Sequence, residues 1–74
     1  MLYRVLFQWD NEARVWTATS NDVPGLVLES ASFERLVKRV KLAIPELLEL
    51  NGQEVSEYQV SFQTERCERV ASYG

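Results

Sequence analysis

The side chains that could do chemistry in this chain are few. The sequence contains no histidine, so the side chain that most often serves as a general base near neutral pH is missing. Cys67 is the single cysteine, and without a histidine it cannot form a Cys–His nucleophile pair. Arg66 and Arg69 flank this thiol in the sequence, but an inert thiol is favoured over a redox or nucleophilic role.

The carboxylates and glycines do not form a recognisable catalytic or binding motif. Asp and Glu number eleven, but no spacing among them indicates more than a solvated surface. Gly25, Gly52 and Gly74 are isolated, so there is no glycine-rich phosphate loop. One cysteine without histidine gives no zinc spacing. We therefore predict no enzyme activity, no catalytic residue, no cofactor and no metal; a vestigial nuclease would need clustered carboxylates holding Mg²⁺.

The length of the chain limits the number of domains and the size of the hydrophobic core. Its 74 residues predict a single domain over residues 1–74, with no separate DNA-binding domain. A domain of this size buries only about 60% of its unfolded surface, so its core gives a thin margin of stability. Disulfides, metals or subunit contacts often supplement such small cores. Because one cysteine excludes an intramolecular disulfide and no metal site is visible, we predict a homo-oligomer, a dimer or higher.

Charge and hydropathy limit the partners. The net charge is −3, so the basic surface that nucleic acids require is not expected, whereas a basic protein partner fits. The aromatic residues could form a base-stacking platform, but a core or a subunit interface is favoured for them: Tyr3, Phe7, Trp9 and Trp16. No signal peptide and no membrane span is recognisable, which together with the lone cysteine predicts a cytoplasmic protein without membrane partners.

Alternating hydrophobicity predicts an N-terminal hairpin. Residues 2–9 place Tyr3, Val5, Phe7 and Trp9 on one apolar face, which we assign to the core. A polar turn leads to a second strand over residues 14–20. Trp16 lies opposite a face rich in threonine, so we expect both sides of the sheet to be covered, one by a helix and the other by a second subunit.

The middle of the chain predicts a turn, a short strand and a helix. Pro24-Gly25 is typical of a type II turn and precedes a strand over residues 26–29. From Phe33, apolar residues recur with helical spacing: 33, 36, 37, 40, 44, 47 and 48. Ser32 suits the N-cap and Asn51-Gly52 the end of the helix. Pro45 lies inside this pattern, so we expect one helix kinked near residues 41–45.

A last alternating segment, residues 57–64, predicts a final strand. The order strand-strand-strand-helix-strand predicts an α+β fold with two layers, an antiparallel sheet and one long kinked helix. The outer face of the helix carries mainly charges and reads as an ordinary solvated surface: Arg35, Lys38, Arg39, Leu42, Glu46 and Glu49. Leu42 among these charges hints at a contact with a partner.

One combination of segments resembles a known family. The strand "VWTATS" leads into Asp22-Val23-Pro24-Gly25-Leu26, and then into the helix start "SASFERL". This order resembles the N-terminal domain of the HicB-like antitoxins, in particular a short branch of uncharacterised HicB-like domains. The resemblance covers about residues 3–62. Its most specific feature is the position of the D-x-P-G motif between the hairpin and the helix. Pro45 departs from the family pattern.

The resemblance implies a partly degenerate RNase-H-like fold and a non-catalytic role. HicB-type antitoxins bind and neutralise a small basic toxin that cleaves mRNA, so this chain would be the inhibitor. They usually add a C-terminal DNA-binding domain, for which residues 65–74 are too few, so operator binding is not carried over. The alternative is a stand-alone homo-oligomeric domain that binds another protein or a small ligand. The candidate partner-binding residues are Asp22, Glu29, Trp16 and Leu42.

Overall fold

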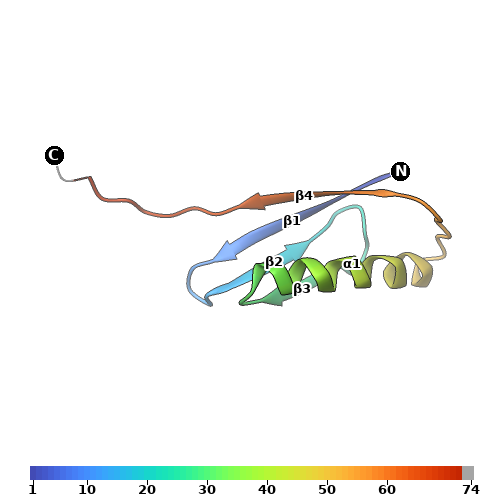
Figure 1. The fold of residues 1–74 in the computed structure, drawn as a ribbon, viewed down its shortest axis with the longest axis horizontal. Helices are drawn as coiled ribbons and strands as arrows, with labels where there is room; N and C mark the ends of the chain where they lie inside the picture. Colours follow the sequence, from blue (N-terminus) through green and yellow to red (C-terminus); the bar gives the residue numbers. More distant parts are fainter. Residues whose placement is uncertain (73–74) are drawn as a thin grey trace.

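A computed structural model describes residues 1–72 (Figure 1). Its elements are β1 (Leu2–Asp10), β2 (Val15–Thr19), β3 (Val27–Ser30), α1 (Phe33–Leu50) and β4 (Gln59–Glu65). The strand-strand-strand-helix-strand order and the α+β class predicted from the sequence are confirmed. The strand limits differ from the predicted ones by one or two residues.

The sheet has the order β3-β2-β1-β4 and is mixed. The antiparallel prediction holds for β1 with β2 and for β2 with β3, but it is wrong for β4, which runs parallel to β1. The helix causes this difference. It returns the chain along the sheet to the end where β1 starts, and there Gln59 N donates to Met1 O over 2.9 Å. Because β4 and β1 start at the same end of the sheet, they run in the same direction.

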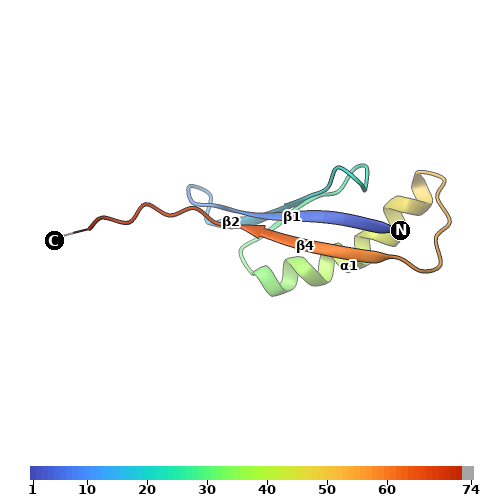
Figure 2. The ribbon, with the colours of Figure 1, turned by 90° about the horizontal axis from the view of Figure 1, so that it is seen from above.

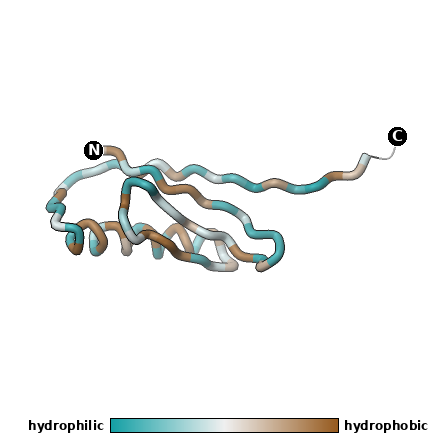
Figure 3. The backbone as a smooth tube through the Cα atoms, turned by 180° about the vertical axis from the view of Figure 1, so that it is seen from behind, coloured by the Kyte–Doolittle hydropathy of each residue, from teal (hydrophilic) through white to brown (hydrophobic). Residues whose placement is uncertain are grey.

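The core lies between the helix and one face of the sheet. It is formed by ten buried apolar residues: Tyr3, Val5, Phe7, Ala18, Val23, Leu26, Leu36, Val40, Ile44 and Leu48. Figure 3 shows hydrophobic and hydrophilic segments alternating along α1, as expected for a helix with one buried stripe. Along β1 the predicted core face is confirmed, and Trp9 at its end is partly buried.

The structure decides which face of β2 is buried. Ala18 is fully buried and Trp16 packs against the core, so both point toward the helix side. Thr17 and Thr19 point to the other side of the sheet, where no described residue forms a second layer. The small Ala18 side chain leaves room for the helix to approach the sheet.

Both ends of α1 follow the sequence signals. Ser32 accepts a hydrogen bond from Arg35 N, as an N-cap residue does. Gly52 follows the helix with a φ of +75°, a conformation that favours glycine. The helix continues without interruption through the exposed Pro45, which confirms one helix rather than two. The kink near Pro45 stays a prediction.

The chain leaves the body of the domain after β4. Residues 66–72, the arm, extend away from the sheet and the helix (Figures 1 and 2). They account for an elongated outline of 56 × 21 × 18 Å. The radius of gyration is 14.7 Å, whereas a compact chain of this length has about 11 Å.

Candidate functional site

The side of the sheet opposite α1 is a regular surface that no other element among the described residues covers. Helix α1 packs against β2 and β3 from one side only (Figure 2). Strand register places the following residues on the opposite side, the open face: Leu2, Arg4, Leu6, Gln8, Asp10, Val15, Thr17, Thr19, Val27, Glu29, Gln59, Ser61, Gln63 and Glu65. Apolar and uncharged polar side chains form most of it.

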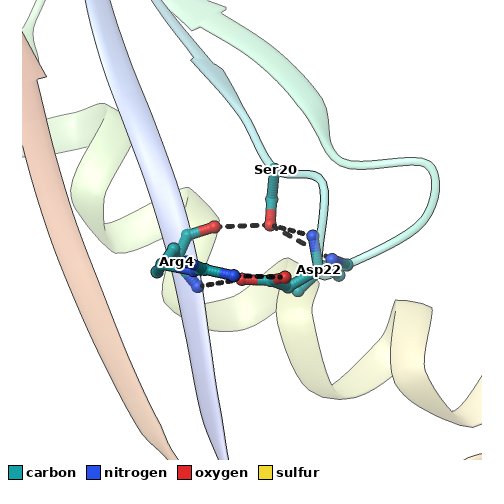
Figure 4. A network of polar contacts seen from close by, with 4 residues as sticks. Arg4, Ser20 and Asp22 are labelled. Atoms are coloured by element: carbon teal, nitrogen blue, oxygen red, sulfur yellow. Dashed lines mark hydrogen bonds and ion pairs between the residues drawn. The ribbon is translucent and has the colours of Figure 1, made fainter.

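The loop after β2 is fastened to β1 at one end of the open face. The Ser20 hydroxyl donates to the Arg4 carbonyl oxygen over 2.6 Å and accepts from the backbone N–H groups of Asp22 and Val23, each over 3.1 Å (Figure 4). Local bonds of this kind are the reason that serine is common in turns. The Ser20 hydroxyl thereby stabilises the conformation of the loop and also attaches the loop to β1.

Arg4 and Asp22 form a second fastening at the same place. The Asp22 carboxylate accepts from Arg4 N over 2.8 Å, from Nε over 3.1 Å and from Nη2 over 3.4 Å. The hydrogen bond from the Arg4 guanidinium, and after it the bond from the Arg4 backbone N–H, lower the pKa of the Asp22 carboxyl. The hydrogen bond to the Asp22 carboxylate and its negative charge in turn raise the pKa of the Arg4 guanidinium. The strand and the loop are thus joined through one partly buried carboxylate.

The Pro24-Gly25 segment is structural. Leu26 N donates to Val23 O over 3.2 Å, and Gly25 has a φ of +85°, as expected at the third position of a type II turn. Val23 and Leu26, the two ends of this turn, are buried in the core. The turn therefore fixes the path from β2 to β3.

A shallow hollow of about 270 Å³ lies beside this loop on the open face. It is lined by Arg4, Leu6, Thr19, Ser20, Asn21, Asp22 and Gln63. Sequence reasoning missed the hollow because Arg4 and Asp22 lie 18 positions apart and meet only through the hairpin register. One signal was available, since Arg4 is the one charged residue within the apolar alternation of residues 2–9.

The charges around the open face are mainly acidic. Among the four strands and the loop after β2, Arg4 is the one basic side chain of this face, against four carboxylates: Asp10, Asp22, Glu29 and Glu65. Asp22 pairs with Arg4, so the remaining acidic side chains set the sign of the surface. Such a surface is complementary to a basic partner and would speed the encounter with it.

The four predicted partner-binding residues do not form one surface. Asp22 and Glu29 border the open face. Trp16 lies on the helix side, with its ring centroid 5.0 Å from that of Phe33 and 5.5 Å from that of Trp9. Leu42 lies on the helix and is 71% exposed. The structure thus brings two of the four together.

Residues 1–72 contain no group of three or more His, Cys, Asp or Glu whose arrangement could hold a metal ion. In the same range, α1 lacks the apolar length needed to cross a bilayer. Cys67 is free and exposed.

Fold and surface together define a small α+β domain with a mixed four-stranded sheet that is covered by a helix on one side. The chain belongs to a family described as a domain of unknown function (DUF1902), whose model matches residues 2–73. Among solved structures, it is similar to the hypothetical protein TTHA1013 from the extremely thermophilic bacterium Thermus thermophilus. The identity is 39% and the TM-score 0.73, over 97% of this chain and all of the other. A comparison with curated proteins found no match.

Replacing Asp22 with asparagine tests the fastening between loop and strand. The lowered pKa means that the carboxylate stabilises the fold above the pKa of unfolded aspartate, about 3.9. This contribution disappears as the pH falls through the still lower pKa of the folded state. We expect Asp22→Asn to lower the thermal midpoint slightly at pH 7, and the difference from the wild type to vanish at strongly acidic pH.

A double-mutant cycle with Arg4→Met separates the contribution of the Arg4–Asp22 ion pair to stability from that of the hydrogen bonds within the loop. If the pair acts as described, Asp22→Asn has a smaller effect in the Arg4→Met background, and added salt reduces the effect in the wild-type background. An Asp22→Asn difference that grows toward acidic pH would contradict this account.

Proposed function

We propose that this domain is a non-catalytic protein-interaction module of the HicB antitoxin type, which binds and neutralises a small basic mRNA-cleaving protein. In this proposal the partner occupies the open face. The bound surface includes Glu29 and the loop around Asp22.

The observation that carries the proposal is the open face itself. It combines a sheet surface without a covering layer, exposed apolar side chains such as Val27, and an excess of carboxylates. Interfaces of transient complexes mix apolar and polar contacts in this way, with charge setting the choice of partner. An acidic surface and a net charge of −3 both favour a basic protein.

The outer face of the helix supports the proposal less well. Its first half is basic and its second half acidic, so it has no uniform sign to select a basic partner. Leu42 is its single large exposed hydrophobic residue before Leu50. An isolated exposed apolar residue is common on protein surfaces.

Two matched substitutions discriminate between these surfaces. Val27 on the open face is 74% exposed, and Leu42 on the helix is 71% exposed, so we expect the fold to accommodate an arginine at either position. Val27→Arg places a bulky cation on the open face. We expect it to weaken binding of the basic partner by at least about tenfold, since a like charge at an interface costs more than a lost contact. Leu42→Arg is expected to leave binding unchanged.

The experiment is a pull-down from host lysate with the wild type and both variants, followed by an RNA-cleavage assay of the recovered protein. The proposal requires a small basic protein that cleaves RNA alone and loses this activity when the wild-type domain is added. Loss of binding in Leu42→Arg but not in Val27→Arg would move the site to the helix. Recovery of no such protein would overturn the antitoxin role.

A second candidate function is a stand-alone domain that binds a small ligand, and the hollow beside Arg4 favours it. The hollow presents a guanidinium, hydroxyls and amide groups, which suit a small polar molecule. However, its volume of about 270 Å³ is below the usual range for ligand sites, about 300–1,000 Å³, and such sites are usually mostly apolar. A thermal-shift screen of anionic metabolites with wild type and Arg4→Met would test this alternative.

A further inference from the structure

The two edges of the sheet differ in how well they can accept another strand. Edge strand β3 has four residues, and the Glu29 carbonyl oxygen at this edge already accepts a hydrogen bond from Arg39 Nη1 over 2.8 Å. Edge strand β4 has seven residues. A longer edge without such a block is the better template for strand addition.

Backbone geometry shows which groups of β4 point outward. Gln59 N donates to Met1 O, so the N–H groups of Gln59, Ser61 and Gln63 face β1. The N–H and C=O groups of the alternate residues then point away from the sheet: Val60, Phe62 and Thr64. Helix α1 packs under β2 and β3, so it does not cover this edge.

The arm continues the line of β4 and is fastened at its start. The Arg66 guanidinium lies 4.8 Å from the centroid of the Trp9 ring, on the helix side of the sheet. Arg66 Nη2 also pairs with the Glu68 carboxylate over 2.6 Å. The ladder between β1 and β4 ends with the pair Gln8 and Glu65, so residues 66–72 make no strand pairing within this copy.

The sequence of this junction is complementary to itself. Residues 65–69 read Glu-Arg-Cys-Glu-Arg. If two copies run antiparallel with Cys67 opposite Cys67, Glu65 of each copy faces Arg69 of the other. In the same register, Arg66 of each copy faces Glu68 of the other. Every charge in the segment therefore meets an opposite charge, and cross-strand pairs of this kind stabilise antiparallel sheets.

We propose that two copies of this chain associate through residues 64–70, antiparallel and centred on Cys67, to join their sheets across a two-fold axis. This interface is isologous, as in most homodimers. It lies at the edge of the sheet, whereas the partner in the proposed function occupies its face. The proposal therefore stands or falls independently of the antitoxin role.

The proposed register also agrees with the alternation of side chains between the two faces of a strand. Glu65 lies on the open side and Arg66 on the helix side. In the proposed dimer the alternation of β4 continues through the arm, which puts Glu68 on the helix side and Arg69 on the open side, so each opposite pair shares one side of the joined sheet. Thr64, Arg66, Glu68 and Val70 point their backbone groups outward and form the hydrogen-bonded pairs. Cys67 then occupies a non-hydrogen-bonded pair, in which opposite Cα atoms are about 4.5 Å apart.

A charge exchange within one chain tests this register. Arg69→Glu places two glutamates opposite each other twice in the dimer, and Glu65→Arg does the same with arginines. We expect either single variant to raise the dimer dissociation constant by about tenfold or more, because exposed pairs contribute modestly and each is made twice. The double variant Glu65→Arg/Arg69→Glu restores opposite charges and is expected to restore the dimer.

Sedimentation equilibrium at several concentrations gives the dissociation constants. Arg35→Glu is the matched control for Arg69→Glu: it makes the same change in net charge on the exposed helix surface, and a glutamate three residues after the Ser32 cap supports the helix. A wild type that stays monomeric up to about 1 mM would overturn the proposal. So would a double variant no better than the single variants.

Oxidative cross-linking gives an independent readout. Diamide accepts two electrons and two protons from two Cys67 thiols, which leaves one disulfide between the copies. The expected Cα separation lies within the range that a disulfide spans. We expect rapid covalent dimers in the wild type, slower formation in Arg69→Glu, and recovery in the Glu65→Arg/Arg69→Glu variant.

The control for cross-linking moves the thiol along the arm. In a Cys67→Ser/Val70→Cys variant, residue 70 faces Thr64 of the other copy, so its thiols are too far apart to react readily. Equal rates at positions 67 and 70 would indicate random collision of mobile arms and would overturn the register. The same rate in the wild type and in Arg69→Glu would overturn the role of charge.

Discussion

Replacement of Phe7 by alanine is expected to cost about 3–5 kcal/mol of the free energy of unfolding. Phe7 is fully buried, and its ring centroid lies 5.1 Å from that of Phe33 at the start of the helix. Removing it leaves a cavity between sheet and helix. Since a domain of this length has about 4–11 kcal/mol in total, a large part of its stability would be lost.

Urea unfolding at a fixed protein concentration measures the change, because self-association would otherwise alter the midpoint. Phe62→Ala is the matched control. Its ring contacts Phe7 at 5.7 Å between centroids but is 38% exposed, so we expect a loss of only about 1–2 kcal/mol. Similar losses for the two variants would show that Phe7 does not hold the two layers together.

Replacement of Pro45 by alanine is expected to stabilise the domain. Pro45 lies inside α1 and is exposed, so its removal leaves no cavity. Alanine restores an N–H that can donate to the Lys41 carbonyl and removes the clash of the ring with that carbonyl. Proline costs about 3 kcal/mol relative to alanine in a helix interior, and its stiffening of the unfolded chain offsets about 0.4–1 kcal/mol. We therefore expect a net gain of about 2 kcal/mol.

The gain would appear as a higher urea midpoint with an unchanged slope. Glu46→Ala is the control at the next exposed position, where only the small difference in helix propensity applies and the change should stay within about 0.5 kcal/mol. If Pro45→Ala were neutral or destabilising, the helix would be adapted to proline by a bend that alanine does not keep.

Val27→Arg, the Asp22→Asn cycle and the charge exchange at residues 65 and 69 address different surfaces of the same small domain. The first tests the open face, the second the loop beside it, and the third the edge of the sheet. Asp22 and Glu65 also border the open face, so each variant is measured for partner binding and for self-association before variants are combined. A domain that binds a partner on its face and a second copy at its edge would present two partner sites per dimer.

The local features of the fold were predictable from the sequence because they depend on neighbouring residues. Alternation determined β1 and its buried face, and the 3.6-residue period determined α1 with Ser32 as its cap. Pro24-Gly25 determined a turn whose hydrogen bond the structure contains. The order of elements followed from these local signals.

Features that depend on distant residues were decided by the tertiary structure. The direction of β4 could not be read from its alternation, because the same pattern suits a parallel or an antiparallel edge strand. The separation of Trp16 and Leu42 from Asp22 and Glu29 depended on which side of the sheet the helix covers. The meeting of Arg4 with Asp22 depended on the hairpin register.

The arm shows both kinds of information in one segment. The order of charges in residues 65–69 can be read from the sequence, but the sequence does not show which other residues these charges face. The structure places the segment at the end of an edge strand, where the pairing with β1 stops, and the Arg66 guanidinium lies over the Trp9 ring. Sequence alone thus determined the local elements of this protein, through contacts between near neighbours. The tertiary structure alone decided which faces and edges remain free, because that depends on how the elements pack together.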